Sequence, residues 1–132
     1  MYTVLRFSAG DACTDEMLVG IGARLNGLVP RAFERLDRVG RRFSVSVSSK
    51  DDWETNIAET LAFIRAAGPA IDAARKIGII VAADTAIEPE DFRGRPWLSS
   101  AMPPDLMAQF VEADVSLIVT VIAPGLEGRP TR

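Results

Sequence analysis

The stretch RRFSVSVSSKDDW, residues 41–53, raises the first question of chemistry, because three serines alternate in it with three apolar residues. Ser44, Ser46 and Ser48 would form one row on a β-strand. A serine becomes a useful nucleophile only beside a base that takes its proton. The chain contains no histidine, so the usual Ser-His and Cys-His arrangements are excluded. We interpret the row as the solvent-facing side of a sheet and expect no catalytic residue in it.

The missing histidine and the single cysteine also limit metal chemistry. Zinc sites are built mainly from histidine and cysteine, so we expect no metal and no cofactor. Cys13 precedes a predicted helix, where a thiol can become reactive. We expect no basic group beside it and favour a small, partly buried side chain. One cysteine allows no disulfide within the chain.

Acidic residues cluster twice, at Asp51-Asp52 and at Glu88, Glu90 and Asp91. Oxygen-ligand metal binding and acid–base work are the alternatives that such clusters raise. Neither stretch has the spacing of a calcium-binding loop. Helix capping and solvation explain them with fewer assumptions.

Five arginines within residues 31–42 make the densest basic patch: Arg31, Arg35, Arg38, Arg41 and Arg42. Arg31, Arg35 and Arg38 would share one face if this segment is helical. One interpretation is a site for an anion or an acidic partner. The other is a solvated surface on which the arginines pair with Glu34 and Asp37. No aromatic residues interleave the arginines, which argues against binding of single-stranded nucleic acid.

A second candidate site is DFRGRPWLSS, residues 91–100, expected in a long loop. Arginines and aromatic residues often anchor interfaces and ligands, and long loops in compact domains are often functional. The alternative is that Trp97 folds back and caps the core. We add Trp53 on the hypothesis that it lies near this loop. The candidates here are Phe92, Arg93, Arg95, Trp97 and Trp53.

These residues must be positioned by strands and helices whose hydrophobic periods can be read directly. The sequence predicts strands at residues 2–9, 41–50, 78–87 and 115–122, and helices at 14–27, 56–68, 69–78 and 103–114. Residues 29–42 fit either a short helix or an irregular arm. The third and fourth strands are apolar without alternation, which is typical of strands covered on both faces. The order predicts an α/β (α+β) sandwich with about four strands in a mixed sheet, helices mainly on one face, nearest to a ferredoxin-like arrangement.

Local signals refine the helices. Thr14 is a plausible N-cap, and Asn26-Gly27 is a natural helix end. Gly20 and Gly22 weaken the first helix, so another group should pack closely against it. Asn56 and Glu59 have the spacing of a capping box.

Length and charge set broader limits. A chain of 132 residues suits one domain, expected at residues 1–122 with a mobile tail at 123–132. The net charge of −3 argues against nucleic acid as an obligatory partner. No secretion signal or apolar run long enough for a membrane span is evident. We therefore expect a soluble, cytoplasmic protein without a membrane partner.

Three stretches together resemble the domain-of-unknown-function family 4279, a set of small bacterial proteins. They are VLRFSAGDACTDEM, the tryptophan at position 53 before NIAETLAFIRAAGPAI, and MPPDLMAQFVEADVSLIVTVI. The resemblance covers most of residues 2–122 as a pattern of elements. It departs from the family at residues 29–42, where an arginine-rich segment replaces a shorter connection with glycine. The family carries no assigned activity, so the resemblance implies no catalytic residue.

The sequence thus favours a non-enzymatic module that binds a protein or a small anionic ligand, such as an immunity-type or accessory protein. The alternative is an enzyme that acts on an anionic substrate through carboxylates and arginines. The two-sided apolar strands add the hypothesis of a homodimer, in which a second copy covers the open face of the sheet.

Overall fold

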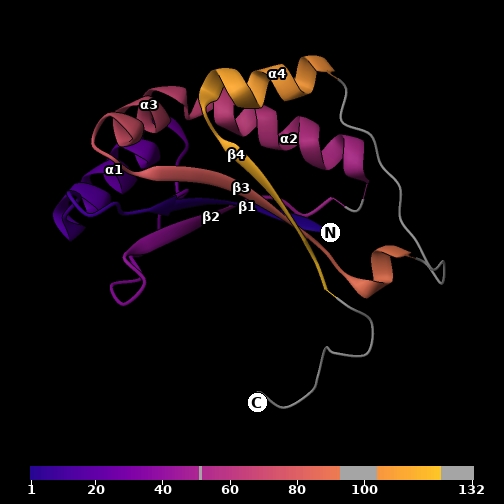
Figure 1. Ribbon diagram of the computed structural model, residues 1–132, viewed down its shortest axis with the longest axis horizontal. Helices are drawn as coiled ribbons and strands as arrows, with labels where there is room; N and C mark the ends of the chain where they lie inside the picture. The colour runs from indigo at the N-terminus through magenta and orange to yellow at the C-terminus, as the bar shows by residue number, and fades with distance from the viewer. Residues whose placement is uncertain (51, 93–103, 123–132) are drawn as a thin grey trace, which may run out of the picture.

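The computed structural model describes residues 1–50, 52–92 and 104–122, in which strands and helices alternate (Figure 1). The strands are β1 (Tyr2–Ser8), β2 (Arg42–Ser48), β3 (Ile80–Ile87) and β4 (Ser116–Val121). The helices are α1 (Asp15–Leu28), α2 (Trp53–Ala66), α3 (Gly68–Lys76) and α4 (Pro104–Ala113), with a short 3₁₀ helix η1 (Pro89–Phe92) after β3. The expected loop site at Arg93, Arg95 and Trp97 lies outside the described residues, as do Asp51 and residues 123–132.

The four strands form one open mixed sheet in the order β2-β1-β3-β4. β1 is antiparallel to both of its neighbours, whereas β3 and β4 are parallel. A parallel pair needs a crossover, which here includes η1 and α4. The predicted α+β class and four-stranded mixed sheet are confirmed, and the expectation of helices mainly on one face stays a prediction. β2 is an edge strand, which matters for the site below.

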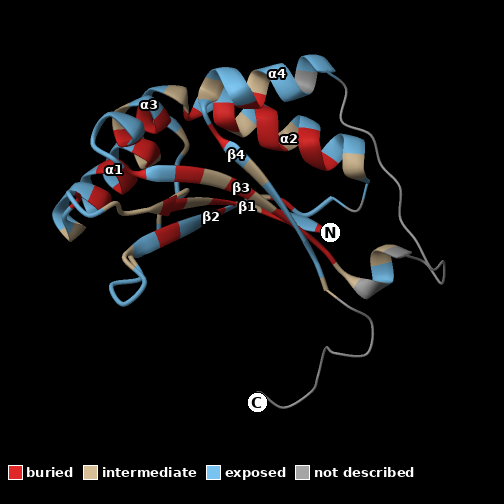
Figure 2. Ribbon diagram, viewed as in Figure 1, coloured by how far each residue is buried: buried red, intermediate tan, exposed pale blue. Residues whose placement is uncertain are grey.

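Buried and more exposed residues alternate along β1 and β2, so that one face of these strands packs against the core. Leu5 and Phe7 are fully buried, and Phe43 and Val45 are almost so. The residues between them, including Ser44 and Ser46, are exposed or partly exposed, as Figure 2 shows. The solvent-facing interpretation is therefore confirmed for these two serines. It is wrong for the third, at position 48, which is buried beyond a register shift in the β1–β2 pairing.

The other face of the sheet differs from the prediction. Ile80 in β3 is 64% exposed and Ile118 in β4 is 44% exposed. On the same face, Asp84 lies opposite Ile118 in the β3–β4 register and forms an ion pair with Arg6 of β1. The third and fourth strands are thus not covered on both faces within the described chain. Apolar runs gave the wrong answer because small and β-branched residues also suit a half-exposed strand.

Two of the three predicted helix ends need correction. Thr14 does cap α1, since its hydroxyl accepts from the backbone N–H of Met17 at 3.2 Å. However, α1 continues through Asn26-Gly27 to Leu28. The N-cap of α2 is Asp52, whose carboxylate accepts from the backbone N–H of Thr55 at 2.8 Å. The hydrogen bond from the Thr55 hydroxyl, and then the one from its backbone N–H, lower the pKa of the Asp52 carboxyl below its usual value. Asn56, expected in a capping box, is instead buried.

Asn56 belongs to a buried polar chain that joins β1, β3 and α2. Its side-chain oxygen accepts from the Thr3 hydroxyl, and its amide donates to the carbonyl of Lys50 at 3.1 Å. Thr3 has a single hydroxyl proton, so Thr85 must donate in the 2.7 Å contact between the two threonine oxygens. Every bond of this chain has one donor and one acceptor, which is how polar groups are tolerated in a core.

Residues 29–41 form an irregular arm rather than a helix. The ring of Phe33 packs edge-on against Phe43 with centroids 4.8 Å apart, and Phe43 stacks on Phe7 at 4.6 Å. Asn26 fixes the same point of the arm, accepting from the Phe33 N–H at 2.7 Å and donating to its carbonyl at 2.9 Å. Gly22 supplies the space, because a Cβ there would lie 2.4 Å from the Phe33 ring. The close packing predicted for the first helix is confirmed at Gly22.

The two glycines of α1 give a matched pair of variants. Gly20→Ala meets open space and should raise the free energy of unfolding by about 0.5–1 kcal/mol through helix propensity. Gly22→Ala gains the same propensity but must displace the Phe33 ring, so it should lower that free energy by about 1–3 kcal/mol. Urea unfolding followed by circular dichroism measures both. Equal stabilisation by the two alanines would contradict the assigned position of Phe33.

Candidate functional site

A hollow of about 930 Å³ runs between the arm and the free edge of β2. We call it the arginine groove. Its walls carry apolar side chains at Val29, Leu36 and Phe63, the last from α2. Ser44 and Ser46 of β2 form part of its floor. Five cationic side chains line it: Arg6, Arg31, Arg35, Arg38 and Arg42.

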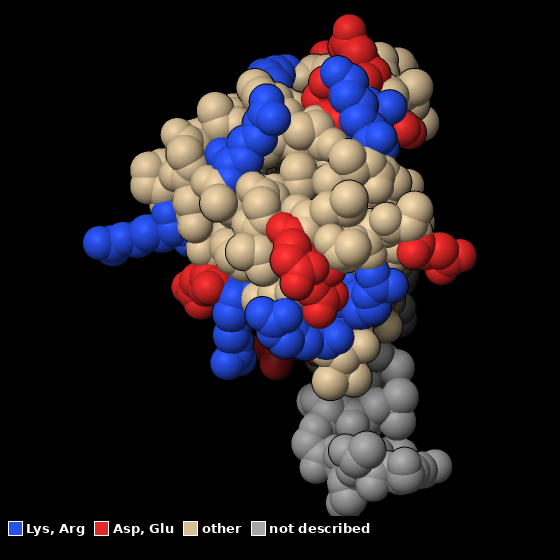
Figure 3. Space-filling model, turned by 90° about the vertical axis from the view of Figure 1, so that its left-hand side faces the viewer, with Lys and Arg blue, Asp and Glu red and all other residues tan. Residues whose placement is uncertain are grey.

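Only some of the arginines that line the groove have a carboxylate partner among the described residues. Arg38 lies 3.4 Å from the Asp15 carboxylate and Arg42 lies 3.7 Å from that of Asp37. Arg31 and Arg35 are exposed and make no ion pair with any residue that the structure describes. Figure 3 shows basic and acidic side chains intermixed on the side of the molecule that carries α1. The sequence therefore anticipated part of the pairing, that with Asp37, and missed Asp15.

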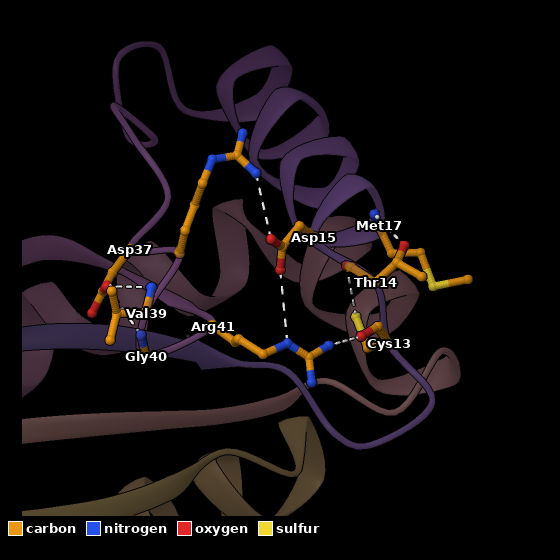
Figure 4. A network of polar contacts seen from close by, with 9 residues as sticks. Cys13, Thr14, Asp15, Met17, Asp37, Val39, Gly40 and Arg41 are labelled. Carbon is orange, nitrogen blue, oxygen red and sulfur yellow. Dashed lines mark hydrogen bonds and ion pairs between the residues drawn. The ribbon is translucent and has the colours of Figure 1, made fainter.

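Arg41 has a structural role beside the groove (Figure 4). Its guanidinium donates to the backbone carbonyl of Cys13 and lies 3.7 Å from Asp15, which also receives Arg38. The interpretation that no basic group lies near Cys13 was therefore wrong, because a residue 28 positions later supplies one. Burial nevertheless dominates and raises the pKa of the Cys13 thiol, with Arg41 opposing it. Cys13 is 2% exposed, more deeply buried than expected.

A short hairpin at residues 37–42 joins the arm to β2. Asp37 and Arg42 exchange two backbone hydrogen bonds of 2.8 and 3.1 Å. The Asp37 carboxylate accepts from the N–H groups of Val39 and Gly40, both at 3.1 Å, which closes the turn (Figure 4). Asp37 is therefore occupied by the turn, and the groove's other acid, Glu34, is exposed. Neither provides a desolvated carboxylate for acid–base catalysis.

Arg6 is a lining residue that the sequence reasoning missed. Its guanidinium lies 3.1 Å from Asp84 of β3, and Asp84 also accepts from the Thr120 hydroxyl of β4 at 2.9 Å. This network joins three strands across the face opposite the core. The signal was present, because alternation in the first strand sets Arg6 opposite to Leu5 and Phe7. The ion pair with Asp84 could not be predicted in this way, because Asp84 is distant in sequence.

The candidates named from the sequence divide into three groups. Arg35, Arg38 and Arg42 are brought together in the groove, together with Arg31. Arg41 is adjacent and half-buried, and Trp53 begins α2, partly buried against the core. Arg93, Arg95 and Trp97 are outside the described part of the chain, so the hypothesis that Trp53 lies near them stays a prediction.

The acidic stretches act as caps and ion-pair partners. Asp91 accepts from the Glu88 N–H at 2.7 Å and from the Met1 amino group at 2.7 Å. Together with Asp52 at the start of α2, this supports the capping interpretation. No group of three or more histidine, cysteine, aspartate or glutamate side chains suited to a metal ion occurs among the residues described.

A second hollow of about 550 Å³ lies between α4 and β4. Met107, Val111 and Leu117 give it an apolar lining, and Asp114, the one charged residue among its described lining, is 2.8 Å from Arg75. It lacks the convergent polar groups that orient a small ligand. The arginine groove is therefore the better candidate.

Comparisons with known proteins found no relative of this chain. The chain matches no model of a known protein family, no curated protein and no solved structure. Within the described residues, none of the helices has the length and apolar content needed to cross a bilayer.

The burial of Cys13 predicts slow reaction with Ellman's reagent. The thiolate is the reacting form, and a raised pKa together with burial lowers both its amount and its access. At pH 8 the native protein should react at least about tenfold more slowly than the same protein in urea. The chain has only this cysteine, so the measured rate belongs to one thiol. Equal rates in buffer and in urea would show that the thiol is accessible.

Proposed function

We propose that the protein is a non-enzymatic binding module whose arginine groove takes an acidic polypeptide partner. The observation that carries the proposal is the set of five arginines along one hollow, two of which have no carboxylate partner in the described chain. Exposed guanidinium groups without partners are poised to make charge-assisted hydrogen bonds to carboxylates. The apolar side chains of Leu36 and Phe63 in the same hollow suit a polypeptide better than a bare inorganic anion.

The alternative, an enzyme acting on an anionic substrate, has less support. Catalysis by carboxylates needs at least one whose surroundings keep it poised for proton transfer. The two carboxylates of the groove, Glu34 and Asp37, are exposed, and the second is held by the turn. The accessory or immunity-type role and the resemblance to family 4279 remain part of the proposal, as does a homodimer.

The proposal predicts binding of blocked octaglutamate in a titration of the ¹⁵N-labelled protein. Amide shifts should concentrate in residues 29–46 and weaken with salt. The double variant Arg31→Gln/Arg35→Gln should weaken binding about tenfold, because two exposed pairs are lost. Arg24→Gln/Lys76→Gln removes the same charge outside the groove and should leave the affinity within about twofold.

Two results would overturn this function. One is equal weakening by the two double variants, which would indicate attraction to net charge alone. The other is tighter binding of an oligothymidylate of equal charge, which would favour nucleic acid over an acidic polypeptide.

A further inference from the structure

We propose that the acidic partner binds as an extended segment that adds to the sheet as a fifth strand, antiparallel to β2. This inference rests on the function proposed above and specifies how the same groove holds its partner. It follows from the backbone of β2, the path of the arm and the two faces of the edge.

The outward-pointing backbone groups of β2 can be identified from two contacts. The Ala9 N–H donates to the Arg41 carbonyl at 2.9 Å, so residue 41 faces β1. Arg42 exchanges both of its backbone bonds with Asp37 on the other side. Because the backbone groups of successive residues alternate in direction, those of Ser44 and Ser46 also point away from β1.

The arm begins to pair with this edge and then departs. Continuing the hairpin from the Asp37–Arg42 pair would set residue 35 opposite Ser44. Instead, the arm is held at Phe33 by Asn26 and by the packing against Gly22. No described strand pairs with the outer side of β2 at Ser44 or Ser46, and both residues are exposed. An unpaired edge of this kind is the template for strand addition.

The two faces of β2 predict a partner segment in which acidic and apolar residues alternate. A residue opposite Ser44 or Ser46 has its side chain on their face, where Arg42 also lies. The residue between these two points to the core face, toward Val45 and Phe63 of the groove wall. The matching segment is therefore acidic, apolar, acidic. A second copy of this chain fits less well, because antiparallel pairing of two β2 strands would set serines rather than carboxylates opposite Ser44 and Ser46 and would add the arginines of a second groove.

The test uses the blocked peptide acetyl-Val-Glu-Val-Glu-Val-amide with the full-length protein. In the proposed register the two glutamates lie opposite Ser46 and Ser44 and exchange backbone bonds with them, whereas the N–H of the central valine points away. N-methylation of both glutamates should weaken binding at least about tenfold. N-methylation of the central valine should change it less than about twofold. At saturation, hydrogen exchange should slow at Ser44 and Ser46 and stay unchanged at Phe43 and Val45, which already bond to β1.

The outcomes separate this inference from the proposed function. Equal affinity of the two methylated peptides, with dependence on Arg31 and Arg35 preserved, would overturn strand addition and leave the acidic groove standing. Strand addition is also overturned, and the groove retained, if octaglutamate shifts the groove but the alternating peptide shows no saturable binding at about 5 mM. Loss of dependence on both arginines and backbone would overturn both proposals.

Discussion

The course of the arm depends on one packing constraint, the position of the Phe33 ring between α1 and the sheet. Gly22 leaves room for it at this point of α1, where a Cβ would collide with the ring, and Phe43 of β2 supplies the edge-to-face partner. Asn26 adds two backbone hydrogen bonds to the same residue. Because these contacts come from two different elements, α1 and β2, the arm cannot follow β2 as a regular strand. The groove exists because the arm is held away from the edge it began to pair with.

The same constraint divides the arginines into two kinds. Those near the hairpin find carboxylates, as Arg38 and Arg41 do at Asp15. Those on the diverging part of the arm, Arg31 and Arg35, find none among the described residues. Pairing at an exposed surface contributes little to stability, so this division matters more for recognition than for folding. Among the described arginines of the groove, those without a carboxylate partner are Arg31 and Arg35, on the part of the arm that leaves the edge of β2.

The sequence was informative where the cause of a structure is local. Hydrophobic period predicted the strands and helices, and Thr14 was recognised as a cap from its position alone. Gly22 indicated close packing but not the residue that packs, since Phe33 lies in a segment without a clear period. Asn56 was misread because its partners, Thr3 among them, come from a distant strand. The groove could not be predicted for the same reason: it needs β2, α2 and the arm in one place.

The groove combines the charge of its arginines with the backbone hydrogen-bonding groups at the edge of β2, and these two differ in physical character. Arg6 is neutralised by Asp84, which Thr120 also holds, so this arginine is a fixed donor and adds little net charge. The field that attracts an acidic segment therefore comes mainly from Arg31 and Arg35, whose exposure makes it sensitive to salt. Backbone pairing at Ser44 and Ser46 carries no net charge and is far less affected. In the proposed binding mode, attraction by the arm brings an acidic segment to this edge, and the edge then determines its register, because a shift by one residue would move its acids from Arg42 to the apolar wall at Phe63.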